Sequence, residues 1–397
     1  MDTTNDPILI FKTNTDAQRI RLTAHQEYFD SITLVETGEE LIEKGETGEL
    51  HHTFPKKGEQ QIAVRFKKDI KDLSCCFYKC MTLIKIPEKL FEHCTEVECF
   101  DQCFSRFDDR CNLLPESVAN FEYMSLQNIP EGLFDKCTKA KSFQECFAYT
   151  SIKDIPQGLF KHCTKAIEFS ECFQGCYYLQ SIPETLFSKC TKAIFFGKCF
   201  AGTSIKDIPQ GLFEHCTEAL TFWGCFQNCC NLQTIPEALF SKCTKAKSFK
   251  GCFAFTSIND IPQELFEHCI EVEDLSWCFF ECSCLRTIPQ RLLNKCRKVK
   301  NLAGCFSRTN VRTIPQGLFD HCPEVEDFSA CFYECTQLQN LPQGLFDKCT
   351  KAKEFCGCFR NTKIQIIPQG LLENDEDIIN CFKDVPYLYY DFPFQFD

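Results

Sequence analysis

Apolar and polar residues recur along this chain with a fixed period between about residue 75 and residue 370. An Ile-Pro or Leu-Pro step opens each repeat, and the intervals between these prolines alternate between 26 and 27 residues without exception. The evenly spaced prolines are Pro130, Pro156, Pro183, Pro209, Pro236, Pro262, Pro289, Pro315, Pro342 and Pro368. The true period is therefore 53 residues in two similar halves. A period of this length is typical of repeat architectures.

Within each half the apolar positions keep fixed distances from the proline. A cysteine follows Pro156 at Cys163, and a Cys-Phe pair follows at Cys172-Phe173. Four residues after that pair begins, one half has Cys and the other has Thr. The consensus is I-P-x-x-L-F-x-x-C-T-x-[AV]-x-x-F-x-x-C-F-x-x-[CT]-x-x-L-x-x-I-P. Such regularity predicts a solenoid, because each coil can bury its apolar side against identical neighbours.

The residue types inside one repeat predict an α/β fold. L-x-x-I before the proline suits a short strand, and P-x-x-L-F-x-x-C suits one or two helical turns, since proline is tolerated at the first helical position. The [AV]-x-x-F segment suits a second extended piece, and C-F-x-x-[CT] a tight helical turn. We expect about eleven coils whose parallel strands stack at about 4.8 Å.

Two regions outside the repeat predict further domains. Residues 1–70 contain short alternating segments such as ILIFKTN and QIAVRF, which predict a small β-rich N-terminal module. The solenoid is expected over residues 71–370, with one coil distorted around a degenerate anchor at Pro115. The cysteine phase is lost after Pro368, so residues 371–397 are expected to cap the last coil.

The run CFQGCYYLQSIPETLFSKC, from Cys172 to Cys190, resembles the repeat of the BspA-like leucine-rich-repeat proteins, F-x-x-C-x-x-L-x-x-I. The likeness covers about residues 75–370 and implies a leucine-rich-repeat-like solenoid. HHTFPKKGEQQIAVRF, at residues 51–66, is similar to the last strands of a polycystic-kidney-disease-type β-sandwich, which can precede such repeats. The resemblance implies surface-displayed binding and adhesion in bacteria or protists.

Charge and hydropathy argue against several classes of protein. A net charge of −12 disfavours nucleic-acid binding, which needs a basic face. No apolar run approaches the roughly 18 residues of a membrane span. The start of the chain, MDTTNDPILIFKTN, has no basic segment and no long apolar segment, so we expect no secretory signal. That expectation favours the cytoplasm or a virion, whereas the resemblance implies a cell surface.

The 33 cysteines leave three interpretations open. Buried reduced thiols are favoured, because cysteine is a small apolar residue when it is reduced. Disulfides between equivalent cysteines of adjacent coils are the alternative, at a separation near 5 Å. A metal is disfavoured, because successive C-x-x-x-C pairs are 53 residues and therefore two coils apart. We expect no metal and no cofactor.

Three further series are interpreted as structural. The histidines that precede the first cysteine alternate with lysines, so that position is expected to be exposed; they are His93, His162, His215, His268 and His321. Lys192 is expected beside Glu218, and Lys245 beside Glu271, as coil-to-coil charge pairs. The phenylalanines are expected to fill the core and not to stack on nucleic-acid bases.

The variable polar positions inside L-x-x-I are the best candidates for recognition, because solenoids use such aligned faces for extended ligands. A merely solvated face is the alternative. These candidates are Lys153, Asp154, Gln180, Lys206, Asp207, Gln233, Asn259, Asp260, Arg286, Arg312 and Gln339. No nucleophile elbow, phosphate-binding Gly loop or H-E-x-x-H motif is present, so we do not expect an enzyme.

The leading functional hypothesis is a non-enzymatic binding or adhesion protein that presents a repeat face to a protein or glycan. One alternative is a structural component of a virion or appendage, in which the repeats act as a rigid spacer. Another is an intracellular scaffold or inhibitor with reduced thiols.

Overall fold

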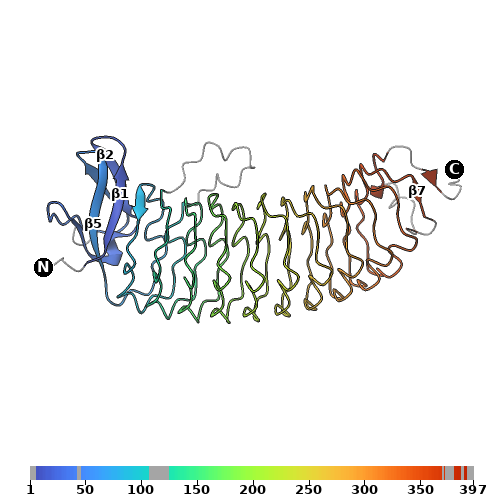
Figure 1. Ribbon diagram of the computed structural model, residues 1–397, viewed down its shortest axis with the longest axis horizontal. Helices are drawn as coiled ribbons and strands as arrows, with labels where there is room; N and C mark the ends of the chain where they lie inside the picture. The colour runs from blue at the N-terminus through green and yellow to red at the C-terminus, as the bar shows by residue number, and fades with distance from the viewer. Residues whose placement is uncertain are drawn as a thin grey trace. The chain divides into compact units, whose positions relative to one another are not determined.

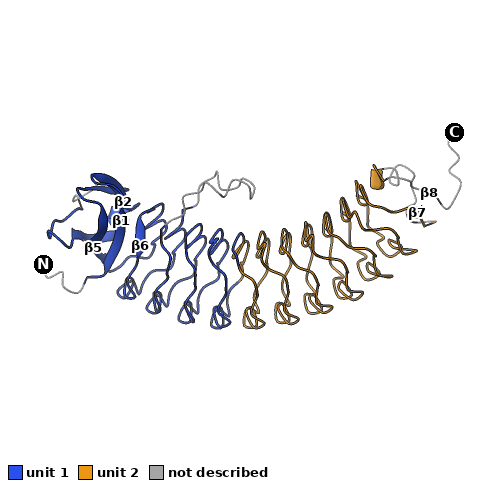
Figure 2. Ribbon diagram, turned by 45° about the horizontal axis from the view of Figure 1, so that its top comes forward, with its two compact units in different colours: residues 1–193, 202–204 blue, residues 194–201, 205–397 orange. Residues whose placement is uncertain are grey.

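A computed structural model describes residues 6–42, 46–106, 125–368, 371, 380–385 and 389–390. The chain divides into two compact units, residues 1–193 with 202–204 and residues 194–201 with 205–397 (Figure 2). In each unit one half-repeat forms one coil, and successive coils stack in parallel (Figure 1). The predicted repeat solenoid is therefore present.

The first unit begins with antiparallel strands. They are β1 (Ile8–Thr13), β2 (Gln18–Thr23), β3 (Phe29–Leu34), β4 (Leu50–Phe54) and β5 (Gly58–Phe66), with the short 3-10 helix η1 (Gln26–Tyr28) before β3. β1 and β5 match the predicted segments ILIFKTN and QIAVRF. One sheet has the order β3-β5-β1-β6 and a second pairs β2 with β4. Because β6 (Leu83–Lys85) belongs to the first L-x-x-I segment, the sheet continues into the first coil.

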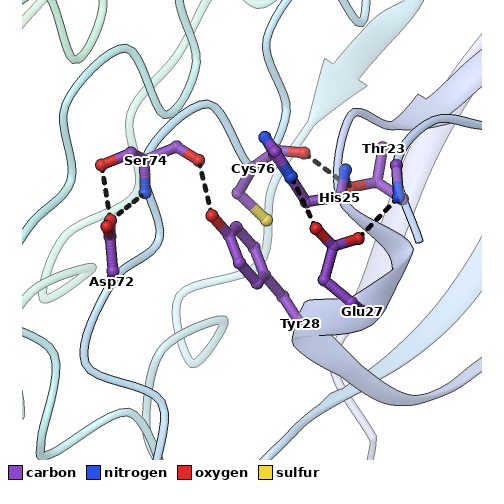
Figure 3. A network of polar contacts seen from close by, with 8 residues as sticks. Thr23, His25, Glu27, Tyr28, Asp72, Ser74 and Cys76 are labelled. Atoms are coloured by element: carbon purple, nitrogen blue, oxygen red, sulfur yellow. Dashed lines mark hydrogen bonds and ion pairs between the residues drawn. The ribbon is translucent and has the colours of Figure 1, made fainter.

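Side chains of the β-rich module form hydrogen bonds with backbone carbonyls at the outer edge of the first coil (Figure 3). In later coils the carbonyls at positions equivalent to Ser74, Cys76 and Tyr78 accept N–H groups from the preceding coil. The first coil has no predecessor. The Tyr28 hydroxyl donates to the Ser74 carbonyl (3.3 Å), Thr23 Oγ1 to that of Cys76 (2.6 Å) and Arg21 Nη1 to that of Tyr78 (3.1 Å). The module thus satisfies backbone acceptors that the stack leaves open.

The [AV]-x-x-F and C-F segments form the main coil-to-coil ladder. Parallel bridges join Asp72, Cys99, Ser142 and Glu168 in the first unit, and Phe195, Thr221, Ser248, Asp274, Asn301, Asp327 and Glu354 in the second. The Phe147 N–H donates to the Cys172 carbonyl (2.9 Å), and that of Tyr149 to the Gln174 carbonyl (2.7 Å). The predicted extended piece at [AV]-x-x-F is confirmed.

The predicted helical turn at C-F-x-x-[CT] is wrong. Glu145 (φ 52°), directly before this segment, and Tyr149 (φ 58°), within it, both have positive φ. An α-helix would direct every N–H along its own axis, whereas this backbone directs alternate N–H groups at the neighbouring coil. The requirement to bond the next coil therefore decides the local conformation.

The predicted helix at P-x-x-L-F-x-x-C is also wrong within the described part of residues 71–368. The segment consists of turns closed between residues three apart, for example Leu159 N–H to the Pro156 carbonyl (3.3 Å) and Cys163 N–H to that of Phe160 (3.0 Å). Such bonds suit short segments that reverse direction within a few residues. Among the described residues, the L-x-x-I segments are extended but form bridges only at Asn128–Asp154 and Thr313–Asn340, besides the strands β6 and β7 (Ile366–Ile367).

Three columns of phenylalanine fill the interior of the coils. In the first unit Phe143 stacks on Phe169 (5.6 Å between ring centroids) and Phe147 on Phe173 (5.6 Å). In the second unit Phe226 stacks on Phe253 (5.7 Å), and their neighbours continue the column. These rings are almost fully buried. The prediction of a phenylalanine core is confirmed.

The sequence departs from the regular repeat around Pro115 and after Pro368. Pro115 lies outside the described residues, but Phe104 stacks directly on Phe147 (5.5 Å), so no further coil separates these two rings. Near the C-terminus, Cys381 and Phe382 are buried and Phe382 stacks on Phe359 (5.1 Å). The cysteine phase therefore continues once more after Pro368. The last strands, β7 (Ile366–Ile367) and β8 (Tyr389–Tyr390), pair in parallel.

Candidate binding surface

All eleven L-x-x-I positions predicted for recognition are exposed, from Lys153 to Gln339, while the flanking Ile or Leu side chains are mostly buried. The segments lie side by side within each unit. The Lys153 N–H donates to the Gln127 carbonyl (3.1 Å), and the Asn259 N–H to that of Gln233 (3.2 Å). We call these aligned positions the strand face.

Two arginines are adjacent on the strand face of the second unit. The Arg312 N–H donates to the Arg286 carbonyl (3.3 Å), so these exposed residues occupy neighbouring coils. Thr287 and Thr313 follow them on the same segments and are exposed as well. The result is a local basic patch on a chain whose net charge is −12. The guanidinium groups of such a patch can donate hydrogen bonds to carboxylates or other acceptor groups of a partner.

A polar groove of about 460 Å³ lies at the corner that precedes the strand face in the second unit. Four successive coils contribute one residue each at the position before [CT]: Glu281, Arg308, Glu334 and Asn361. We call these residues the corner cluster. The Arg308 guanidinium bridges the carboxylates of Glu281 (Nη1 to Oε2, 3.2 Å) and Glu334 (Nε to Oε2, 2.8 Å). A hydrogen bond from the Tyr333 hydroxyl, with Arg308 nearby, lowers the pKa of Glu334.

Aromatic side chains border the corner cluster. The Arg308 guanidinium lies 5.8 Å from the centre of the Phe280 ring and 6.0 Å from that of Tyr333. Trp277 contacts Phe280 edge to face (5.1 Å) and is 36% exposed. Sequence reasoning missed this surface. The available signal was the variability of the position before [CT], which is glycine in some coils and charged in others.

The charged series forms coil-to-coil ion pairs, but with a partner that differs from the prediction. Lys245 forms an ion pair with Glu218 (2.6 Å) and not with Glu271. Glu271 forms its ion pair with Lys298 (2.6 Å). Each lysine therefore reaches back to the preceding coil. Lys351 and Glu324 repeat the arrangement (2.6 Å). The five histidines of the alternating series are exposed, as predicted.

Most thiols of the described residues are buried, and burial works against their ionisation. Burial raises the pKa of Cys176 and of Cys335 to about 11, so both stay protonated at neutral pH. Cys176 Sγ lies 3.2 Å from Thr150 Oγ1 of the preceding coil. Cysteine and threonine thus alternate in this column, and this Cys cannot pair with an equivalent Cys there. No disulfide joins the cysteines of the described residues.

No known protein family's sequence profile matches the chain, and no curated protein matches it. Among solved structures, the chain is similar to one in a TLR13–ssRNA13 complex, with 11% identity, a TM-score of 0.41 and coverage of 78% of this chain and 45% of that one. It is also similar to one in the Toll–Spatzle complex of Drosophila, with 13% identity, a TM-score of 0.35 and coverage of 77% and 48%. The chain spans about half the length of these solved chains.

Across the described ranges, no helix is long and apolar enough to cross a membrane. Among the same residues, no group of three or more His, Cys, Asp or Glu side chains has a geometry that could hold a metal ion.

Proposed function

We propose that this chain is a non-enzymatic recognition protein whose strand face binds an extended protein or glycan partner. The observation that carries the proposal is the basic patch of Arg286 and Arg312, aligned in neighbouring coils by a backbone hydrogen bond. Buried isoleucines hold the segments while the polar positions between them vary, so the surface can change without cost to the core. The net charge of −12 makes nucleic acid the less favoured partner.

The proposal includes the finer features that the sequence suggests. They are kinship with the BspA-like proteins, a polycystic-kidney-disease-type module in residues 1–70, a solenoid in residues 71–370 and a cap in residues 371–397. Adhesion at a cell surface is the corresponding biological role. The antiparallel strands before the coils support a separate N-terminal module, and the stacking of Phe382 on Phe359 supports a C-terminal segment that covers the last coil.

The test is to replace Arg286→Glu together with Arg312→Glu. Immobilised wild-type chain and variant are compared for the proteins and glycans that they retain from an extract of the source cells. We expect the variant to retain its partner at least tenfold less, because like charges replace complementary ones. Its stability should change by less than about 0.5 kcal/mol, because both positions are exposed.

The matched control is Lys242→Glu with Arg297→Glu, which makes the same charge change at exposed positions outside the strand face. This control should retain the partner as well as the wild type does. Equal retention by all three chains would show that the strand face is not the binding surface. A symmetric assembly in electron micrographs, formed equally by the Arg286/Arg312 variant, would instead support the structural-spacer alternative.

A further inference from the structure

The corner cluster brings charged and polar groups of successive coils together in one groove. Two carboxylates, one guanidinium and the Asn361 amide line the groove with Thr336. The side chains of Arg308, Glu281 and Glu334 are 43%, 38% and 30% exposed, so they can be reached from solvent. Successive coils carry them at a spacing of about 4.8 Å.

We propose that the corner cluster and its aromatic border bind a neutral oligosaccharide. This inference rests on the function proposed above and assigns the chemical class of the partner. A sugar presents hydroxyl groups that both donate and accept hydrogen bonds, together with apolar C–H faces. Glu281 and Glu334 supply acceptors, Arg308 and Asn361 supply donors, and the rings of Tyr333 and Phe280 supply apolar surface beside them.

The charge of the groove selects against anionic ligands. Two carboxylates face one guanidinium, and both carboxylates already contact it. A phosphate or sulfate would meet a net negative charge there. Nucleic-acid backbones and sulfated or sialylated glycans are therefore disfavoured, whereas uncharged hydroxyl groups can share the free lone pairs of the carboxylates.

The backbone of the corner is not available to an extended peptide. The N–H groups of Glu281, Arg308 and Glu334 donate to the next coil, to the carbonyls of Ser307 (2.9 Å), Tyr333 (2.7 Å) and Arg360 (2.8 Å). A peptide that adds a strand needs free main-chain donors and acceptors. Recognition at this corner must therefore use side chains.

The conformation of the corner offers a way to remove its side chains without harm to the fold. Glu281, Arg308 and Glu334 have φ values of 57°, 57° and 56°, and two of the equivalent positions in the first unit are glycines, Gly175 and Gly202. Glycine adopts positive φ more readily than other residues do. Replacement of Arg308→Gly with Glu334→Gly should therefore empty the groove and leave the coil intact.

The experiment uses the full chain on a printed array of neutral, sialylated and sulfated oligosaccharides. The tightest neutral probe is then titrated by calorimetry. We expect neutral probes to bind, and the Arg308→Gly with Glu334→Gly variant to bind at least about tenfold more weakly, because it loses charge-assisted hydrogen bonds. Tyr333→Ala should weaken binding, while Tyr333→Phe should retain the stacking part of it.

The matched control is Asn228→Gly, the same kind of change at the equivalent corner position outside the groove. It should bind as the wild type does. The inference is wrong if no neutral probe binds at about 1 mM, if only anionic probes bind, or if the double glycine variant binds unchanged. If the array is negative but the Arg286/Arg312 variant still loses its captured partner, the proposed function stands without this site. If that variant also retains its partner, the proposed function fails separately.

Discussion

Two sides of each coil differ in how their backbones are held. On the ladder side, alternate residues Leu275, Trp277, Phe279 and Glu281 all donate their N–H groups to the next coil. On the strand-face side, the segment from Leu285 to Ile288 takes part in only two such bonds among the described residues, from the N–H groups of Asn310 and Arg312 to the carbonyls of Leu285 and Arg286.

The two sides of each coil therefore differ in which residues they can tolerate. The ladder side requires a particular backbone, with positive φ at fixed positions and buried Cys and Phe side chains between them. The strand-face side is anchored by its buried Ile or Leu residues, and the two residues between them remain solvated. Recognition is therefore more easily built on the strand face and at the corner than on the ladder itself.

The largest expected effect concerns the buried thiols at high pH. Burial raises the pKa of Cys282 and Cys190 to about 12, whereas the unfolded thiol titrates near its ordinary value of 9. Between pH 9 and pH 12 the unfolded chain binds fewer protons than the folded chain, so the free energy of unfolding falls as pH rises. Each such thiol contributes up to about 1.4 kcal/mol per pH unit.

Urea unfolding followed at pH 7, 8, 9 and 10 measures this loss. Stability should be nearly constant up to about pH 8 and should fall steeply above pH 9. A variant with Cys230→Ala, Cys284→Ala and Cys356→Ala lacks three exposed thiols and should show the same profile. A flat profile to pH 10 would contradict the burial of the thiol columns.

The second prediction compares the loss of stability caused by replacing a buried phenylalanine with that caused by replacing an exposed residue of the strand face. Phe226 is fully buried and stacks on Phe253 (5.7 Å). Phe226→Ala should cost about 3–5 kcal/mol of unfolding free energy, because it leaves a cavity in the stack. Gln233→Ala, on the strand face of the same coil, should change it by less than about 0.5 kcal/mol. Chemical denaturation of both variants measures their unfolding free energies. Similar losses of stability in the two variants would contradict the distinction between the two sides of the coil.

The smallest effect concerns the surface charge pairs. Lys298 pairs with Glu271 of the preceding coil (2.6 Å), and both side chains are partly solvated, at 53% and 37% exposure. Lys298→Glu should cost about 0.2–1 kcal/mol at low salt and less at high salt, because the pair is screened. Thermal unfolding at two salt concentrations measures this. The exchange of both residues, Lys298→Glu with Glu271→Lys, should recover most of the loss. A larger loss that salt does not reduce would indicate a packing role.

Much of the fold could be predicted from the spacing of Pro, Cys and Phe. The spacing identified the coils, the phenylalanine core and the exposed polar positions from Lys153 to Gln339. It also predicted ion pairs between lysines and glutamates of adjacent coils, but not that the partner of Lys245 would be Glu218. That choice depends on the direction in which the long side chain leans, which the sequence period does not contain.

The corner cluster could not have been derived from the same spacing. Its members belong to four coils that are 26 or 27 residues apart, and the positive φ values of Glu281, Arg308 and Glu334 accompany hydrogen bonds from their N–H groups to the next coil. Helical turns were the natural prediction for C-F-x-x-[CT], because local sequence alone cannot include the N–H acceptors that a neighbouring coil supplies.

The sequence by itself determined that the chain repeats, which residues are buried and which vary at the surface, because burial depends on apolar side chains at regular intervals. The tertiary structure alone decided which backbone groups bond between coils, which lysine meets which glutamate, and that Arg308 lies between Glu281 and Glu334. The physical reason is that these contacts join residues far apart in the chain, whose meeting depends on the rise and alignment of stacked coils.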